Sequence, residues 1–262
     1  MIWPYTYSVN KRGFTLVELL TVVSIIGLLA SIVFSSASSA RENARVAGGK
    51  MQDASLYHAF GDQVVVNFDF SDCTGATVTD LSGNGYSGTI TSGPAGAWPT
   101  DTPYSTGCSM TFDGSSTYIT VGSGTRVLAA PFTISLWVKP VAAGASHAFF
   151  GSRSPTDYSF DAKLTAASAI HGDIGTGSGW ITTSADASSI VPLNKWTFIV
   201  YSVTTTGYKI YANGALVGSG SFTGTPLLFD TNHILRVGQN ALGSEYFSGL
   251  IDSVRIYTAA AF

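Results

Sequence analysis

Several residue types that carry chemistry are scarce in this chain. Charged residues make up 11% of its 262 residues, and it has two cysteines and four histidines. Its three glutamates are Glu18, Glu42 and Glu245, and none lies in a Glu-x-Asp-x-Glu run, which would place the two carboxylates of a glycosidase on one strand. The histidines have no zinc-ligand spacing, and no Ser-His-Asp arrangement is readable. The sequence therefore predicts that the protein is not an enzyme.

Positive charge is also scarce. The net charge is −3, and from residue 61 onward there are eight Lys and Arg against thirteen Asp and Glu, so 8 − 13 = −5. An acidic domain offers no basic face to a phosphate backbone. Nucleic acid is therefore not an expected partner.

One long apolar run is present. Residues 14–34 include fourteen Leu, Ile, Val or Phe, follow the cations Lys11 and Arg12, and contain one carboxylate, Glu18. At 1.5 Å per residue, a helix of this length spans roughly 30 Å, the thickness of a bilayer core. In the free energy of membrane insertion, the apolar residues outweigh the carboxylate, which costs about 3 kcal/mol at most. The run is too long for the core of a cleaved secretory signal, and it predicts a transmembrane helix.

The start of this run resembles a known processing motif. Residues 11–20, Lys-Arg-Gly-Phe-Thr-Leu-Val-Glu-Leu-Leu, are similar to the prepilin motif of type IV pilins and pseudopilins. The resemblance implies that a prepilin peptidase cuts after Gly13, on the cytoplasmic side, and methylates the new amino group of Phe14. It also implies an assembly role for Glu18. A carboxylate in hydrocarbon needs a cation, and the Phe14 amine of a neighbouring subunit supplies one.

Residues 35–60 continue the helical pattern. The pair Gly48-Gly49 predicts a kink or a break, because each glycine weakens a helix by about 1 kcal/mol. Gly61-Asp62 predicts the end of the helix. The predicted organisation is a leader over residues 1–13, a transmembrane helix and stem over 14–60, and a globular domain over 61–262.

Beyond residue 64 the apolar period changes to two. Strands are predicted at residues 64–70, 109–114, 116–121, 132–140, 196–205, 208–222, 234–240 and 251–257. Asn213-Gly214 is a strong hairpin signal, and Asp113-Gly114 is a weaker one. The prediction is a mainly β protein, in which an N-terminal transmembrane and stem helix precedes a two-sheet antiparallel sandwich.

These segments resemble the laminin-G-like, or concanavalin A-like, jelly rolls. The matching runs begin at residues 68–70, continue through Thr-Asp-Leu-Ser-Gly-Asn-Gly at 79–85, and end at 247–257. They cover about residues 64–258 in family order and imply a jelly-roll topology. Phe198 departs from the pattern, because many members have a histidine at this place after the tryptophan.

The jelly-roll resemblance also implies calcium as a cofactor. Members of the family bind calcium through aspartates and loop carbonyls, which makes Asp80, Asn84 and Asp252 the candidate ligands. The alternative is structural: Asp80 and Asn84 stabilise turns, and Asp252 caps a strand end.

Two further expectations concern the domain surface and its cross-links. Cys73 and Cys108 lie in the part expected outside the membrane, where oxidation is permitted, so a disulfide is predicted; two buried free thiols are the alternative. Trp180, Tyr246 and Phe247 lie in or beside glycine-rich loops and are the candidate ligand-binding residues, with loop packing as the alternative. By contrast, Trp137 and Trp196 lie in apolar strands and are predicted to be buried.

The sequence as a whole predicts a type IV pilin-like structural subunit with a head for adhesion or ligand recognition. Its expected partners are a prepilin peptidase, other pilin subunits, the membrane, and a glycan or a matrix or host-surface protein. The precursor is expected to cross the inner (cytoplasmic) membrane once, and the processed subunit to reach an extracellular filament or the cell surface. The alternatives are a pseudopilin of a type II secretion or DNA-uptake system and a membrane-anchored carbohydrate-active enzyme.

Overall fold

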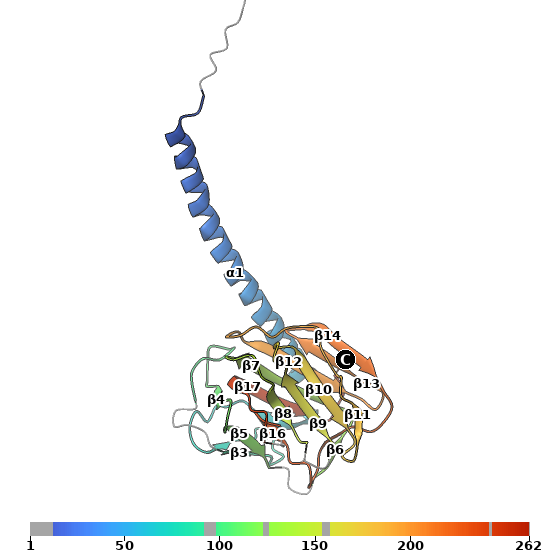
Figure 1. The fold of residues 1–262 in the computed structure, drawn as a ribbon. Coiled ribbons are helices and arrows are strands. Elements are labelled where there is room, and N and C mark those ends of the chain that lie inside the picture. The colour runs from blue at the N-terminus through green and yellow to red at the C-terminus, as the bar shows by residue number, and fades with distance from the viewer. Residues whose placement is uncertain (1–12, 92–97, 123–125, 154–157, 241–242, 262) are drawn as a thin grey trace, which may run out of the picture. The chain divides into compact units, whose positions relative to one another are not determined.

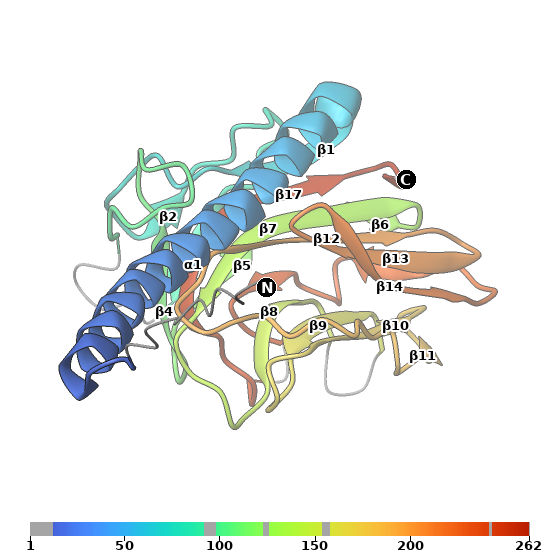
Figure 2. The same cartoon turned by 90° about the horizontal axis from the view of Figure 1, so that it is seen from above.

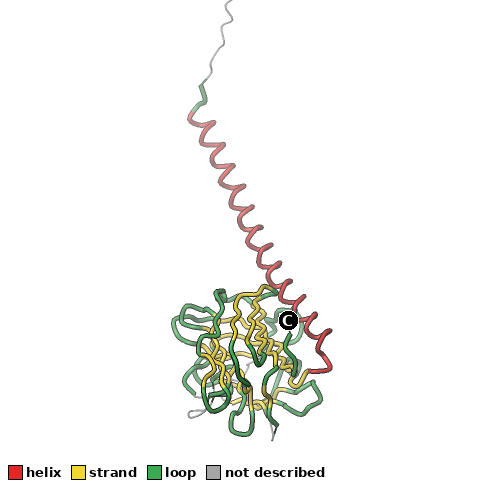
Figure 3. The backbone as a smooth tube through the Cα atoms, turned by 90° about the vertical axis from the view of Figure 1, so that its right-hand side faces the viewer, coloured by secondary structure: helices red, strands yellow, loops and turns green. Residues whose placement is uncertain are grey.

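The computed structural model describes residues 13–91, 98–122, 126–153, 158–240 and 243–261 (Figure 1). The chain divides into two compact units, which join at residues 44 and 45 within helix α1, Leu16–Phe60. After α1 and the short helix η1, Gly61–Gln63, the described chain is built from strands and loops (Figure 3).

Helix α1 is long and apolar enough to cross a membrane. Its most apolar 18-residue window has a mean hydropathy of 2.5. The large apolar side chains between Leu16 and Phe34 are exposed, as expected of a segment whose solvent is lipid. The predicted end at Gly61 is confirmed, because α1 stops at Phe60.

The prediction was a kink or a break at Gly48-Gly49, and the break is wrong, because α1 is continuous through both residues. The second part of the helix packs on a β-sheet (Figure 2). A Cβ atom on Gly49 would lie 2.5 Å from the Trp137 ring and 2.9 Å from the Phe198 side chain. One on Gly48 would lie 2.7 Å from the Asn213 carbonyl oxygen. The two glycines therefore let the helix approach the sheet closely, and packing outweighs their weak helix propensity.

The sheet under the helix has seven strands in the described chain. Its order is β1-β17-β7-β12-β13-β14, and β4 also pairs with β17. The strands are β1 (Val64–Phe68), β4 (Met110–Asp113), β7 (Phe132–Pro140), β12 (Thr197–Val203), β13 (Gly207–Ala212), β14 (Ala215–Ser221) and β17 (Ser248–Tyr257).

The other large sheet has eight strands in the described chain, in the order β11-β10-β9-β8-β16-β5-β3-β2. These are β2 (Thr77–Val78), β3 (Gly88–Thr91), β5 (Tyr118–Val121), β8 (His147–Gly151), β9 (Phe160–Leu164), β10 (Ile170–Gly175), β11 (Trp180–Thr182) and β16 (Arg236–Val237). A small sheet pairs β6 (Leu128–Ala129) with β15 (Leu227–Phe229).

The two predicted turns differ in outcome. Asn213 and Gly214, with φ of 49° and 87°, join β13 to β14 as predicted. Asp113-Gly114 does not form a hairpin, because it connects β4 in one sheet to β5 in the other. Here the Asp113 carboxylate accepts hydrogen bonds from the backbone N–H groups of Ser115, Ser116 and Thr117.

The head, which is the second compact unit of the chain (residues 45–262), has two apolar cores. The larger lies between the two sheets, and the smaller lies between α1 and the seven-stranded sheet. The predicted burial of Trp137 and Trp196 is confirmed, and both belong to the smaller core together with Leu56 of α1. The second compact unit therefore starts inside α1, at Arg45, instead of at residue 61.

The predicted disulfide is confirmed. Cys73 and Cys108 are bonded, with a Cα–Cα distance of 5.5 Å and a sequence separation of 35 residues. In the chain-entropy model, closing a loop of this size stabilises the head by roughly 3–4 kcal/mol.

Candidate functional site

The predicted cleavage site lies immediately before the helix. Phe14 is 86% exposed, and the Cβ position of Gly13 has no neighbouring atom within 4 Å. Neither residue belongs to α1, which begins at Leu16. Gly13 and Phe14 are therefore both exposed among the described residues.

Glu18 closes a capping box at the start of α1. Its carboxylate accepts hydrogen bonds from the Thr15 backbone N–H and hydroxyl, both at 2.8 Å. Its own backbone N–H donates to the Thr15 hydroxyl oxygen at 3.2 Å. These reciprocal bonds satisfy donors at the helix N-terminus. In the uncleaved chain, the isolated carboxylate of the apolar run thus has a partner in its own first turn.

A polar row crosses the outer face of the eight-stranded sheet. Cross-strand pairing aligns Asp173 of β10 with Asp161 of β9, Asp161 with Gly151 of β8, Gly151 with Arg236 of β16, and Arg236 with Thr120 of β5. On β9 the alternate residues Phe160, Ala162 and Leu164 belong to the core. Successive side chains of a strand point to opposite faces, so this row points away from the core.

Five charged side chains gather at one end of this face, and we call Arg153, Asp161, Lys163, Asp173 and Glu245 the charged cluster. The Lys163 Nζ lies 3.2 Å from the Asp161 carboxylate, 3.6 Å from that of Asp173 and 3.1 Å from that of Glu245. The Arg153 Nη1 lies 3.7 Å from the Asp161 carboxylate and 4.0 Å from that of Asp173. Both cations of the cluster are therefore matched by acids.

The charged cluster separates the pKa values of its two aspartates. Burial, together with the negative charges of Glu245 and Asp173, raises the pKa of Asp161 to about 6 despite the nearby Lys163. Burial also acts to raise the pKa of Asp173, but a hydrogen bond with His171 and the charges of nearby cations lower it overall. Such a pair is typical of acid–base enzymes. Asp161, however, is fully buried, and a general acid must reach its substrate.

The predicted ligand-binding aromatics have different environments. Trp180 is half-buried, with its ring 5.0 Å from the Tyr158 ring and 5.0 Å from the Arg153 guanidinium. Tyr246 is also half-buried, 6.4 Å from the Tyr118 ring. The prediction for Phe247 as a ligand contact is wrong, because its side chain is fully buried in the core between the sheets.

Four buried polar atoms on or beside this outer face have no hydrogen-bond partner among the described atoms. They are the Arg153 Nε, the Asp161 Oδ1, the Arg236 Nε and the Asn240 Oδ1. Buried polar groups in folded proteins are nearly always paired with protein, water or a ligand. This face therefore retains capacity for polar partners.

The predicted calcium ligands do not fit a calcium site. The Asp80 carboxylate already accepts hydrogen bonds from the Asn67, Ser82 and Tyr86 backbone N–H groups and from the Ser82 hydroxyl. Burial acts to raise its pKa, but these bonds hold the pKa below the usual value. The Asn84 amide group donates to the Val64 carbonyl oxygen. Among the described residues, no three His, Cys, Asp or Glu side chains gather as a metal site.

The third predicted calcium ligand, Asp252, is buried in β17. It is 3% exposed, and burial raises its pKa to about 7, although the Ser253 hydroxyl donates to its carboxylate. The folded head therefore favours the protonated carboxyl group. In an unfolded chain an aspartate has a pKa near 3.9, so this preference contributes stability below about pH 4 that is lost as pH rises towards 7.

We accordingly expect Asp252→Asn to stabilise the head at pH 8 by about 2–4 kcal/mol and to change little at pH 4. Denaturant unfolding of the full chain in detergent at the two pH values measures this difference. Asp113→Asn is the matched control. At Asp113 hydrogen bonds outweigh burial and lower the pKa of the carboxyl group. Asp113→Asn should therefore lower the stability of the head at pH 8. If Asp252→Asn were less stable than the parent protein at pH 8, this result would contradict the raised pKa of Asp252.

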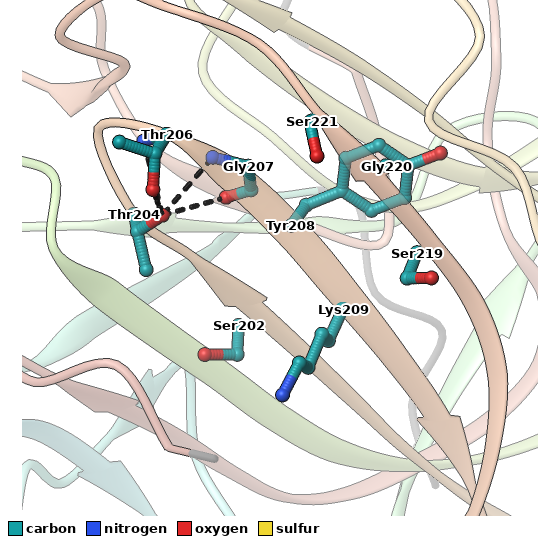
Figure 4. A pocket seen from close by; sticks show the side chains of 9 residues that line it. All are labelled: Ser202, Thr204, Thr206, Gly207, Tyr208, Lys209, Ser219, Gly220 and Ser221. Atoms are coloured by element: carbon teal, nitrogen blue, oxygen red, sulfur yellow. Dashed lines mark hydrogen bonds between the residues drawn. The ribbon is translucent and has the colours of Figure 1, made fainter.

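A separate hollow of about 540 Å³ lies on the seven-stranded sheet (Figure 4). The Thr204 hydroxyl closes the turn before β13 through bonds with the Gly207 N–H and carbonyl groups. The described lining carries hydroxyls, glycines, the Tyr208 ring and one ammonium group, from Ser202, Thr204, Thr206, Gly207, Tyr208, Lys209, Ser219, Gly220 and Ser221. It supplies neither carboxylate nor imidazole, the usual groups for acid–base chemistry.

The charged cluster was not predicted from the sequence. Its residues lie on β9 and β10 and in the loops after β8 and β16, where charged residues and glycines break up the apolar runs. A period-two signal was nevertheless present in Phe-Asp-Ala-Lys-Leu at 160–164, with apolar residues facing in and Asp161 and Lys163 facing out.

Comparison with protein families identifies both parts of the chain. Residues 113–261 match the model described as the concanavalin A-like lectin/glucanases superfamily, and residues 9–34 match that of the prokaryotic N-terminal methylation motif. Both resemblances predicted from the sequence are confirmed. A search of curated proteins finds no match.

Solved structures with the same fold include sugar-bound domains. One is domain 4 of AbnA, a GH43 extracellular arabinanase from Geobacillus stearothermophilus, in complex with arabinotriose; it has 24% identity and a TM-score of 0.57 over 76% of this chain and 94% of that domain. Another is the botulinum neurotoxin serotype D ligand-binding domain with N-acetylneuraminic acid, with 12% identity and a TM-score of 0.56 over 79% of this chain and 50% of that chain. At these identities the likeness establishes the jelly-roll-like fold alone, and the predicted fold class is confirmed.

Proposed function

This chain belongs to the concanavalin A-like lectin/glucanases superfamily, and we propose that it is a type IV pilin-like subunit whose head binds a glycan on a surface filament. The N-terminal methylation motif and the long apolar helix fit a membrane-anchored precursor that is processed by a prepilin peptidase. The head is proposed to provide adhesion.

The observation that carries the glycan proposal is the outer face of the eight-stranded sheet. It combines half-buried aromatic rings, Trp180 and Tyr246, with the charged cluster and with buried polar atoms that lack partners among the described atoms. Binding sites for small ligands are built from apolar and aromatic surface with a few placed polar groups. The sugar-bound neighbours with this fold agree with a sugar as the ligand.

We propose binding without turnover. A glycosidase needs two carboxylates that both reach the glycosidic bond. In the charged cluster Asp161 and Asp173 are buried at 0% and 5% exposure, and Lys163 already contacts both. This arrangement favours a fixed recognition surface rather than a catalytic acid–base pair. Release of reducing sugar by the purified protein would favour the enzyme alternative.

We expect Trp180→Ala to weaken glycan binding roughly tenfold, because the ring is the large, partly exposed aromatic beside the charged cluster. The measurement is a glycan array followed by calorimetry on the full chain in detergent. Leu216→Ala, an exposed apolar residue on the other sheet, is the matched control and should bind as the parent does. Unchanged affinity of Trp180→Ala would contradict binding at this face, and a parent protein that binds no glycan would contradict the proposal.

A further inference from the structure

Arg236 differs from the other cations on the outer face of the eight-stranded sheet. Arg153 and Lys163 both lie within 4.0 Å of carboxylates. The Arg236 guanidinium has no ion pair with any described residue. Its charge on this face is therefore not matched by a side chain of the described structure.

The Arg236 side chain is nevertheless held in place. Its guanidinium lies over the Tyr118 ring, 4.6 Å from the ring centre, and its Nη1 donates to the Gln239 Oε1 at 2.5 Å. Gln239 itself is 1% exposed. A stacked and hydrogen-bonded guanidinium loses little freedom when it meets a ligand.

The same guanidinium keeps unused hydrogen-bonding capacity. Its Nε is buried and has no acceptor among the described atoms. An arginine fork is suited to two parallel hydrogen bonds with a carboxylate. An anionic ligand group is the partner that would match the charge of the guanidinium.

Arg236 lies apart from Asp161 of the charged cluster. In the polar row, Gly151 lies between Arg236 and Asp161, which places the two strands about 10 Å apart. The chain at Asn240 lies over Gly151, whose Cβ position is 3.1 Å from the Asn240 Cα. The Tyr118 ring lies against the guanidinium, and the Tyr246 ring lies 6.4 Å from the Tyr118 ring. A sugar ring could therefore lie on the tyrosines while its charged group meets Arg236.

We propose that Arg236 binds the carboxylate of an acidic sugar, with Tyr118 and Tyr246 contacting its ring. This inference rests on the proposed glycan binding and adds the ligand class. Uronic acids and sialic acids both present a carboxylate on a sugar ring, and the experiment separates them.

The test uses the full chain in detergent and two pairs of probes. One pair is a trisaccharide ending in glucuronic acid and its methyl ester, and the other is N-acetylneuraminyl-lactose and its methyl ester. Esterification removes the charge and leaves the ring, so the affinity ratio within a pair reports carboxylate recognition. We expect the acid of at least one pair to bind tenfold or more tightly than its ester, and added salt to reduce the difference.

Arg236→Gln should abolish this preference, and Arg236→Lys should keep part of it, because lysine retains the charge without the planar fork. Lys209→Gln removes a cation from the other sheet and should leave the preference intact. Melting curves of each variant report whether it is folded.

Equal binding of acid and ester, or a preference that survives Arg236→Gln, would overturn the acidic-sugar assignment and leave glycan binding standing. Binding of neutral glycans alone would overturn it in the same way. A protein that binds no glycan would instead contradict the proposed function itself.

Discussion

Replacing Glu18 by alanine is expected to abolish filament assembly while insertion and processing remain normal. The substitution removes the only carboxylate of the apolar run at 14–34, so insertion into the membrane becomes easier. It also removes the capping-box bonds with Thr15, which weakens the helix start by about 1 kcal/mol. We expect assembly to be lost, because the Phe14 amine of a neighbouring subunit, the proposed partner of Glu18, would then have no counter-charge in the hydrocarbon.

Immunoblotting of membrane fractions measures insertion and processing, and electron microscopy of cells measures filament assembly. Glu42→Ala is the matched control, because it removes a carboxylate from the same helix outside the apolar run. Normal filaments in the Glu18→Ala strain would refute the assembly role. Long surface fibres that bind antibodies to the head in the parent strain would favour a pilus over a pseudopilin.

Replacing Arg255 by alanine is expected to destabilise the head by about 3–5 kcal/mol. The Arg255 Nη1 pairs with the Asp53 carboxylate of α1 at 2.5 Å, and its Nε donates to the Asn67 Oδ1 at 3.0 Å. Asp53 is 2% exposed and also accepts a hydrogen bond from the Tyr104 hydroxyl. Without Arg255 this carboxylate would be buried with its charge uncompensated, which is the costly case for a buried ion pair.

Denaturant unfolding of the full chain in detergent tests this expectation. Lys139→Ala is the control, since its partner Asp101 is about half exposed and such pairs contribute at most about 1 kcal/mol. The Asp53→Ala, Arg255→Ala double variant should lose less stability than the sum of its single variants. A loss in Arg255→Ala no larger than in Lys139→Ala would show that the α1 contact does not support the head.

The sequence was most informative where local patterns are regular. Period-two apolar runs predicted β7, β12 and β17, and Asn213-Gly214 predicted its hairpin, because these features depend on neighbouring residues alone. The processing motif is also local. Ten consecutive residues contain all of it, so the sequence alone is enough to find the resemblance.

The features that were missed depend on tertiary contacts. Gly48-Gly49 predicted a kink or a break because helix propensity is local, and there is no break because the helix packs closely on Trp137, a residue far away in the chain. Phe247 lies next to Tyr246 in a loop, and only the fold decides which ring points inward. The charged cluster needs two strands and two loops to assemble, so no single window of sequence contains it.

The mature N-terminus tests the account most directly. Mass spectrometry of the protein isolated from cells should show a chain that begins at Phe14, carries one added methyl group on its amine and retains the disulfide between Cys73 and Cys108. Such a terminus would provide the cation proposed to pair with Glu18 of a neighbouring subunit. A protein that still begins at Met1 would contradict the pilin-like account, because no amine would be available at the start of the apolar run.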